Sequence, residues 1–174
     1  QSSVRNAVFK LSTQIPKTMT FNKYEIDQQS LYSRALKEAK RIHEDPNPKV
    51  HQYRTLDEIL KQCLRGHYAE LWLMSQGYVD DDRKYKDLYE PDGITSIDVK
   101  VTTCAANCRG VLRQMKDKIL AGIPVARRIY IFLNPLDSDE YEFYGIWNWN
   151  GKDWDGKRAK LTANYDLQTA ITSV

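Results

Sequence analysis

The chain has 174 residues, of which 41% are hydrophobic and 28% are charged, and its formal net charge is +3. This balance is typical of one globular domain and excludes a disordered, highly charged tail. No run approaches the roughly 18 apolar residues of a spanning helix, and the first residues lack the apolar stretch of a signal peptide. We therefore expect a cytoplasmic protein, nucleoid-associated or in the host cytoplasm if viral, with no membrane partner.

Residues 1–27 contain few apolar positions, and Pro16 would interrupt a helix, so we expect an irregular leading arm. Residues 28–45 follow as a helix, in which apolar residues recur at spacings of four, four and three: Leu31, Ala35, Ala39 and Ile42. Pro46 prevents its continuation. We assign residues 1–50 to an N-terminal arm and helix.

A second helix is predicted from residue 56 to about 76, where Thr55 and Glu58 form a capping box and Gly77 ends the helix. Its apolar stripe comprises Ile59, Cys63, Gly66, Glu70 and Leu73. A carboxylate in such a stripe needs a partner, so Glu70 is a candidate site residue, although it could face water at the edge of the stripe. His67 could touch the same site, but simple packing is favoured.

Residues 84–90 and 94–102 are predicted to be extended. In the second segment the period of two places Thr95, Ile97, Val99 and Val101 on one face and Ser96, Asp98, Lys100 and Thr102 on the other. One face is suited to packing and the other carries charge.

A third helix is predicted over residues 107–124, with Cys108, Leu112, Met115 and Ile119 as its buried stripe. Arg109, Arg113 and Lys116, spaced four and three, form a basic stripe that is either a solvated face or a track for nucleic-acid phosphates.

Two further strands are predicted over residues 127–134 and 140–150. The aromatic residues that alternate in the second could stack on unpaired bases, but a role in the core or a dimer contact is favoured. The order α, α, β, β, α, β, β indicates an α/β (α+β) fold.

The three cysteines, Cys63, Cys104 and Cys108, have no C-x-x-C spacing. A disulfide framework is therefore not favoured, and the simplest interpretation is small buried hydrophobic side chains. A zinc site on Cys104 and Cys108 remains an alternative that would need two further ligands.

The stretch YEPDGITSIDVKVTT (89–103) contains the residues that most strongly indicate a catalytic site. Asp92 and Asp98 could supply a carboxylate pair for Mg²⁺, with the carbonyl of Val99 as a further oxygen ligand. Lys100, on the Asp98 face, could position and activate a water molecule and offset negative charge on a phosphate. A surface strand with an ordinary ion pair is the alternative.

Pro91-Asp92 followed by Asp98-Val99-Lys100 resembles the signature of the PD-(D/E)XK nuclease superfamily, and Glu70 resembles the acid that many members carry on the preceding helix. The resemblance covers roughly residues 55–134. It implies a restriction-endonuclease-like core, a central mixed sheet of about four to five strands flanked by helices, here over residues 51–155. We expect residues 156–174 to form a C-terminal tail packed on this core.

The function that the resemblance implies is a Mg²⁺-dependent DNA endonuclease, with Mn²⁺ able to substitute and no organic cofactor. Asp92 and Asp98 would bind the metal, Glu70 would bind a second metal or a metal-bound water, and Lys100 would activate the nucleophile. Cleavage of both strands would require a homodimer. A non-catalytic nucleic-acid-binding module, a protein-interaction domain with surface acids and a nuclease acting on RNA remain alternatives.

Overall fold

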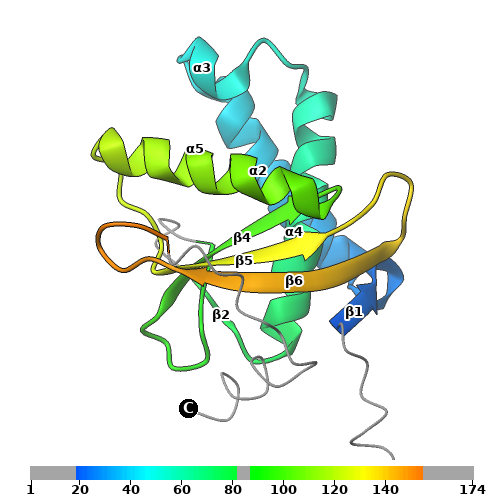
Figure 1. Ribbon diagram of the computed structural model, residues 1–174. Coiled ribbons are helices and arrows are strands. Elements are labelled where there is room, and N and C mark those ends of the chain that lie inside the picture. Colours follow the sequence, from blue (N-terminus) through cyan, green and yellow to red (C-terminus); the bar gives the residue numbers. More distant parts are fainter. Residues whose placement is uncertain (1–18, 82–86, 155–174) are drawn as a thin grey trace, which may run out of the picture.

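The computed structural model describes residues 19–81 and 87–154, which form a mixed α+β fold around one six-stranded sheet (Figure 1). The strands are β1 (Met19–Asn22), β2 (Val79–Asp80), β3 (Leu88–Tyr89), β4 (Ser96–Thr102), β5 (Arg128–Leu133) and β6 (Glu140–Asn148). The helices are α2 (Gln28–Glu44), α3 (Pro48–His51), α4 (Leu56–Ser75) and α5 (Cys108–Leu120), with short 3₁₀ turns at Lys23–Glu25 and Ala105–Asn107. Within the described ranges, no helix combines the length and the apolar character that crossing a bilayer requires.

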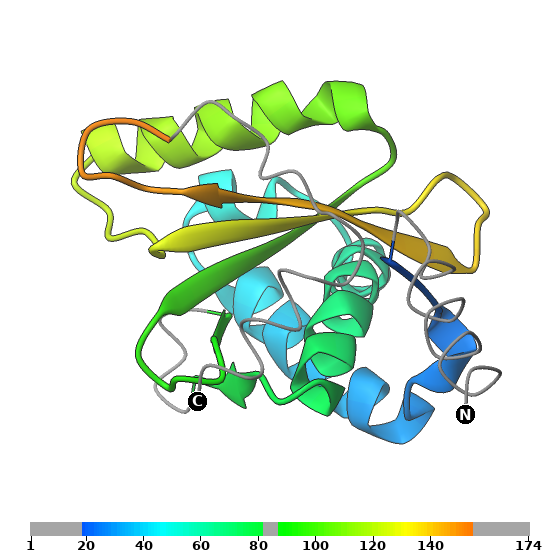
Figure 2. The ribbon, with the colours of Figure 1, turned by 60° about the horizontal axis from the view of Figure 1, so that its bottom comes forward.

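The strand order across the sheet is β1-β6-β5-β4-β3-β2. β4 and β5 are parallel, since α5 connects them as a crossover, and every other neighbouring pair is antiparallel. Figure 2 shows α5 on one face of the sheet and α2 with α4 on the other. The sheet thus separates two apolar layers, and the longest helix, α4, lies in the layer that it shares with α2.

The main helices and strands lie close to the predicted ranges because local signals define their ends. Thr55 accepts a hydrogen bond from the Glu58 amide at 3.2 Å, and Gly77 follows α4 with a φ of 101°, a conformation that glycine adopts without strain. The Asp27 side chain likewise caps α2 by accepting from the Gln29 amide at 3.1 Å.

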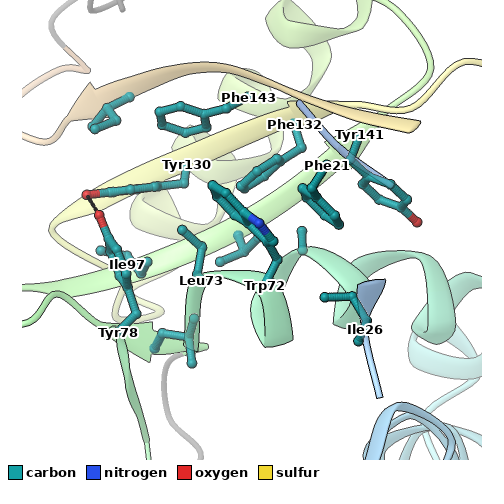
Figure 3. Packing of buried hydrophobic residues seen from close by; sticks show 14 of the residues in the cluster. Phe21, Ile26, Trp72, Leu73, Tyr78, Ile97, Tyr130, Phe132, Tyr141 and Phe143 are labelled. Carbon is teal, nitrogen blue, oxygen red and sulfur yellow. Dashed lines mark hydrogen bonds between the residues drawn. The ribbon is translucent and has the colours of Figure 1, made fainter. Parts of the chain in front are cut away.

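Aromatic side chains fill the core between α4 and the sheet (Figure 3). The ring of Phe21 stacks between Trp72 of α4 and Tyr141 of β6, with centroid separations of 4.9 Å on both sides. Deeper in the same layer, the hydroxyl groups of Tyr78 and Tyr130 are hydrogen-bonded at 3.1 Å. A second cluster, around Met115, Ile131 and Trp147, fills the space under α5. The aromatic strand β6 thus contributes to the core, as expected, but on both sides of the sheet. The alternating pattern predicts a single face, and the register shift of the β5–β6 pair between Ile131 and Phe132 places Trp147 on the face opposite Tyr141 and Phe143.

Residues 19–22 differ from the predicted irregular arm because they form the edge strand β1. Its partner is β6, with Phe21 opposite Tyr141, about 120 residues away along the chain. β2 was not expected either, since two residues are too few to give a pattern. Residues 84–86 of the predicted extended segment lie outside the described residues, as do residues 1–18 of the expected arm and the expected tail.

The cysteines are free, and two of them, Cys63 and Cys108, are buried as expected, whereas Cys104 is exposed. In the described part of the chain, the one His, Cys, Asp and Glu grouping with metal-ligand proximity contains no cysteine. The described residues thus offer no zinc site on Cys104 and Cys108.

Phe132 offers a direct test of the α4 core. It is fully buried and its ring contacts those of Phe21, Trp72 and Phe143. We expect Phe132→Ala to lower the free energy of unfolding by about 3–5 kcal/mol, measured by urea denaturation, because it leaves a cavity among rigid rings. The matched control Leu136→Ala, whose side chain is 79% exposed, should change it by less than about 0.5 kcal/mol. Equal effects of the two substitutions would contradict this packing.

Candidate active site

The candidate site lies at the side of β4 that faces β3. Among the described residues, β3 pairs with β4 through Leu88 with Ile97 and Tyr89 with Ser96. At the next position on this edge, the amide of Val99 donates a hydrogen bond of 2.7 Å to the Asp87 side chain, Oδ2. A carboxylate thus takes the place of a strand partner, and this bond fixes Asp87 beside the charged face of β4.

Asp87 and Asp98 form the centre of the acidic cluster. Burial raises the pKa of Asp87 well above its usual range, and the negative charges of Asp98 and Glu70, together with a side-chain hydrogen bond to Asp98, raise it further. Two carboxylates this close cannot both ionise at low cost unless a cation lies between them. The pair therefore holds either a proton or a positive ion.

Glu70 is contributed by α4 and is 7% exposed. Burial raises its pKa to about 7, Glu38 and Asp98 act in the same direction, and His67 and Arg34 oppose them. Its two oxygens face different partners: Oε1 lies 3.6 Å from Nη2 of Arg34, and Oε2 lies 3.1 Å from Nδ1 of His67. The apolar stripe of α4 thus carries a carboxylate into the site, as its spacing indicated.

Lys100 supplies the positive charge on the same strand face as Asp98. Its Nζ lies 3.7 Å from Oδ2 of Asp98. Burial opposes its charge, but the carboxylates of Asp98 and Asp87 prevail and raise the pKa of Lys100 above its usual value. At neutral pH the side chain is therefore an ammonium group, which donates hydrogen bonds and does not accept a proton.

Two hollows meet at this cluster. One, of about 380 Å³, is lined by the basic face of α2, Arg34, Lys37 and Arg41, and by acids from α2, α4 and the β2–β3 region. The other, of about 230 Å³, includes Val99 and Lys100 in its wall. Four residues border both hollows, namely Glu38, His67, Glu70 and Asp87. A ligand can therefore reach the acidic cluster from either side.

Asp92 lies elsewhere, and this corrects the expectation that it converges with Asp98. It occupies the exposed turn between β3 and β4, where Oδ1 accepts from the amides of Ile94 and Thr95 at 2.8 and 2.9 Å and Oδ2 accepts from the Thr95 hydroxyl at 2.7 Å. These hydrogen bonds lower the pKa of Asp92. An aspartate that stabilises its own turn is a local feature, and the acid beside Asp98 is Asp87.

Val99 presents its backbone to the site while its side chain is buried in the α4 core. The N–H and C=O of one strand residue point to the same side of the strand. Because the Val99 amide points to Asp87, its carbonyl is directed to the same edge. This direction agrees with the expected role of that carbonyl as an oxygen ligand.

The basic stripe of α5 is separate from the two hollows. Arg109, Arg113 and Lys116 are exposed, and α5 packs on the sheet face opposite α2 and α4. Lys116 forms an ion pair of 3.7 Å with the exposed Asp153. Their role as phosphate contacts stays a prediction.

Sequence reasoning missed Asp87 and Glu38. Asp87 lay inside the segment predicted as extended, with no pattern to distinguish it from its neighbours. Glu38 did carry a signal, because it lies on the same helix face as Leu31, Ala35 and Ile42, as Glu70 does on α4. Its carboxylate is hydrogen-bonded to Nε2 of His67, and this bond lowers the pKa of Glu38.

Comparison of the chain with the models of known protein families, with curated proteins and with solved structures gives no match in any of the three.

The raised pKa of Glu70 predicts a pH-dependent stability for the metal-free protein. A carboxyl whose folded pKa is about 7, against an ordinary 4.5, contributes stability below pH 4.5 that is lost as the pH rises through 7. Glu70→Gln removes this dependence and keeps a hydrogen-bonding oxygen for Arg34. In EDTA, the free energy of unfolding of the variant relative to wild type should rise by about 1–3 kcal/mol from pH 5 to pH 8.

Asp92→Asn is the matched control, with the opposite sign. Because the folded pKa of Asp92 is lowered, its ionised form stabilises the protein at neutral pH. The control should therefore be less stable than wild type at both pH values. A wild-type stability independent of pH between 5 and 8 would contradict the buried ionisation of Glu70.

Proposed function

We propose that this protein is a Mg²⁺-dependent endonuclease that hydrolyses phosphodiester bonds in DNA, with Mn²⁺ able to substitute. One observation carries the proposal: Glu70, Asp87, Asp98 and Lys100 interact electrostatically beside β4, where burial and the repulsion between carboxylates raise the pKa values of Glu70 and Asp87. A divalent cation would offset that repulsion, and a phosphate-bound cation would also neutralise the substrate.

The donor set fits a hard, oxygen-preferring ion. Asp87 and Asp98 would hold it through their carboxylates, with the Val99 carbonyl as a third oxygen, and waters and substrate phosphate oxygens would complete the shell. The bound ion would acidify the attacking water and stabilise charge on the phosphate. The hydrogen bond from the Val99 amide fixes Asp87 in advance, so little reorganisation is needed when the ion arrives.

Lys100 would act as a fixed ammonium beside Asp98. It can donate one hydrogen bond to the attacking water and another to a non-bridging phosphate oxygen, aligning the two. The neighbouring carboxylates favour the charged form of Lys100, so Lys100 would orient the water and neutralise charge. The proton that the attacking water loses would pass to another group or to solvent. Glu70 faces the same hollow as Lys100 and is placed to hold a second ion or an ion-bound water.

The order of elements supports the resemblance to the PD-(D/E)XK superfamily, with Asp87 in the role first expected of Asp92. An acid on α4 is followed by an antiparallel β2-β3-β4 unit that ends in Asp98-Val99-Lys100, then by α5 and the parallel strand β5. This is the arrangement that such a core would need to bring these four side chains together.

Positive charge near the site supports a polyanionic substrate. Arg34, Lys37 and Arg41 are spaced three and four on α2 and line the larger hollow. The exposed Lys37 and Arg41 could contact phosphates that flank the scissile bond, whereas Arg34 is paired with Asp80 and Glu70. The exposed Arg109, Arg113 and Lys116 could contact a more distant part of a duplex. A double-strand break would require two such sites, which a homodimer would supply.

A cleavage assay tests this function. Purified protein is incubated with labelled duplex, branched and single-stranded DNA, and with matched RNA, in Mg²⁺, Mn²⁺ or EDTA. We expect metal-dependent cleavage of DNA, and a loss of at least about 100-fold in rate for Asp87→Asn, Asp98→Asn and Lys100→Met, since each removes a metal ligand or the aligning charge.

The control is Asp92→Asn, which should retain most of the activity because Asp92 only stabilises its own turn. Circular dichroism would establish that each variant is folded. Loss of activity in the control with full activity in Asp87→Asn would reject the assignment of Asp87, and cleavage of RNA alone would reassign the substrate. No cleavage by the wild-type protein would reject the function.

A further inference from the structure

The polar side chains beyond the Asp87–Asp98 pair include a histidine with no place in the chemistry described so far. His67 is 6% exposed, lies on α4 one turn before Glu70, and borders both hollows. Its Nε2 shares a hydrogen bond with the Glu38 carboxylate of α2. The opposite ring nitrogen, Nδ1, is fully buried and makes no hydrogen bond.

The unpartnered Nδ1 faces a carboxylate oxygen. It lies 3.1 Å from Oε2 of Glu70 and yet outside hydrogen-bonding geometry. When Nε2–H donates to Glu38, Nδ1 of a neutral imidazole carries a lone pair. A lone pair so close to an ionised carboxylate is repelled unless a proton or a metal cation lies between the two atoms, and their arrangement does not suit a shared proton because it lies outside hydrogen-bonding geometry. Two ligands at right angles and about 2.1 Å from an ion lie about 3 Å apart, so this separation is that of neighbouring ligands in an octahedral shell.

We propose that His67 and Glu70 bind a second divalent cation, of the transition-metal class represented by Mn²⁺, with Glu38 holding the imidazole in the tautomer that presents Nδ1. The ligand atoms of these three residues lie within 4.8 Å of one another. A carboxylate behind a metal-binding histidine fixes the ring orientation and raises its basicity. The inference deepens the proposed function, since it names the ligands of a second metal next to the Asp87–Asp98 site.

The imidazole determines the metal class. Mg²⁺ prefers an all-oxygen shell, whereas Mn²⁺ and later transition metals accept nitrogen and bind such sites more tightly. Arg34 provides a positive charge next to the Glu70 carboxylate, with its Nη2 3.6 Å from Oε1 of Glu70. Its guanidinium also donates two hydrogen bonds to Asp80, at 2.8 and 3.3 Å. Arg34 therefore fixes one oxygen of Glu70 and leaves the other directed at His67.

Metal binding without nucleic acid tests the inference independently of nuclease activity. In calorimetric titrations at pH 7.5, the wild-type chain should bind two Mn²⁺ ions, and His67→Gln and Asp98→Asn should each bind one, from different sites. Glu38→Gln should keep two sites and weaken one by about 10–100-fold, since it disturbs only the group behind the ligand. His43→Gln, an exposed histidine of α2, should behave as wild type.

A spectroscopic measurement covers the case in which His67→Gln does not fold. Pulsed electron paramagnetic resonance of the Mn²⁺-loaded wild-type protein should detect the nitrogen coupling of one coordinated imidazole, and His43→Gln should retain it. Absence of this coupling, or an unchanged stoichiometry in folded His67→Gln, would overturn the second site. Two-site Mn²⁺ binding without cleavage of any nucleic acid would instead reject the nuclease and leave the metal site standing.

Discussion

The hydrogen bond between the Val99 amide and the Asp87 carboxylate is the interaction on which the site depends. In the described structure β3 begins at Leu88, opposite Ile97, and the amide of Val99 beyond this pair is satisfied by the side chain of Asp87. Supplying this acceptor from a side chain brings a carboxylate to the charged face of the strand. One backbone requirement therefore fixes the position of Asp87 relative to Asp98, Lys100 and the Val99 carbonyl.

The fold buries several acidic side chains close to one another, among them Glu70 and Asp87. Glu70 and Asp87 have raised pKa values because the protein surrounds them and because they repel one another and Asp98. The stacked rings of Phe21, Trp72 and Tyr141 fix α4 against the sheet, so the helix cannot relax away from β4. Such a cluster of carboxylates is electrostatically unfavourable, and a bound cation would stabilise it, as in preorganised ion sites generally.

The groups that contact the carboxylates are arranged asymmetrically. Arg34 of α2 and His67 of α4 contact Glu70, whereas Lys100 contacts Asp98 from the same strand. The smaller hollow opens between these two sets and contacts Val99 and Lys100. A phosphate entering there would meet the ammonium of Lys100 and the ions held by the carboxylates, with the basic face of α2 beyond them. This asymmetry would give a nucleic-acid strand a preferred path.

The sequence by itself determined the helices and strands with strong periodicity, and with them Glu70, Asp98 and Lys100, because a residue's face on a helix or strand follows from its spacing alone. Only the tertiary structure decided that β1 joins β6, that Glu38 meets His67, and that Asp87 stands beside Asp98. These contacts join distant segments, so their register is set by packing and not by local pattern. Asp92 lies in a motif-like stretch, yet its hydrogen bonds are satisfied within its own turn. Asp87 reaches the site because it directly precedes β3, where the backbone amide of Val99 needs an acceptor.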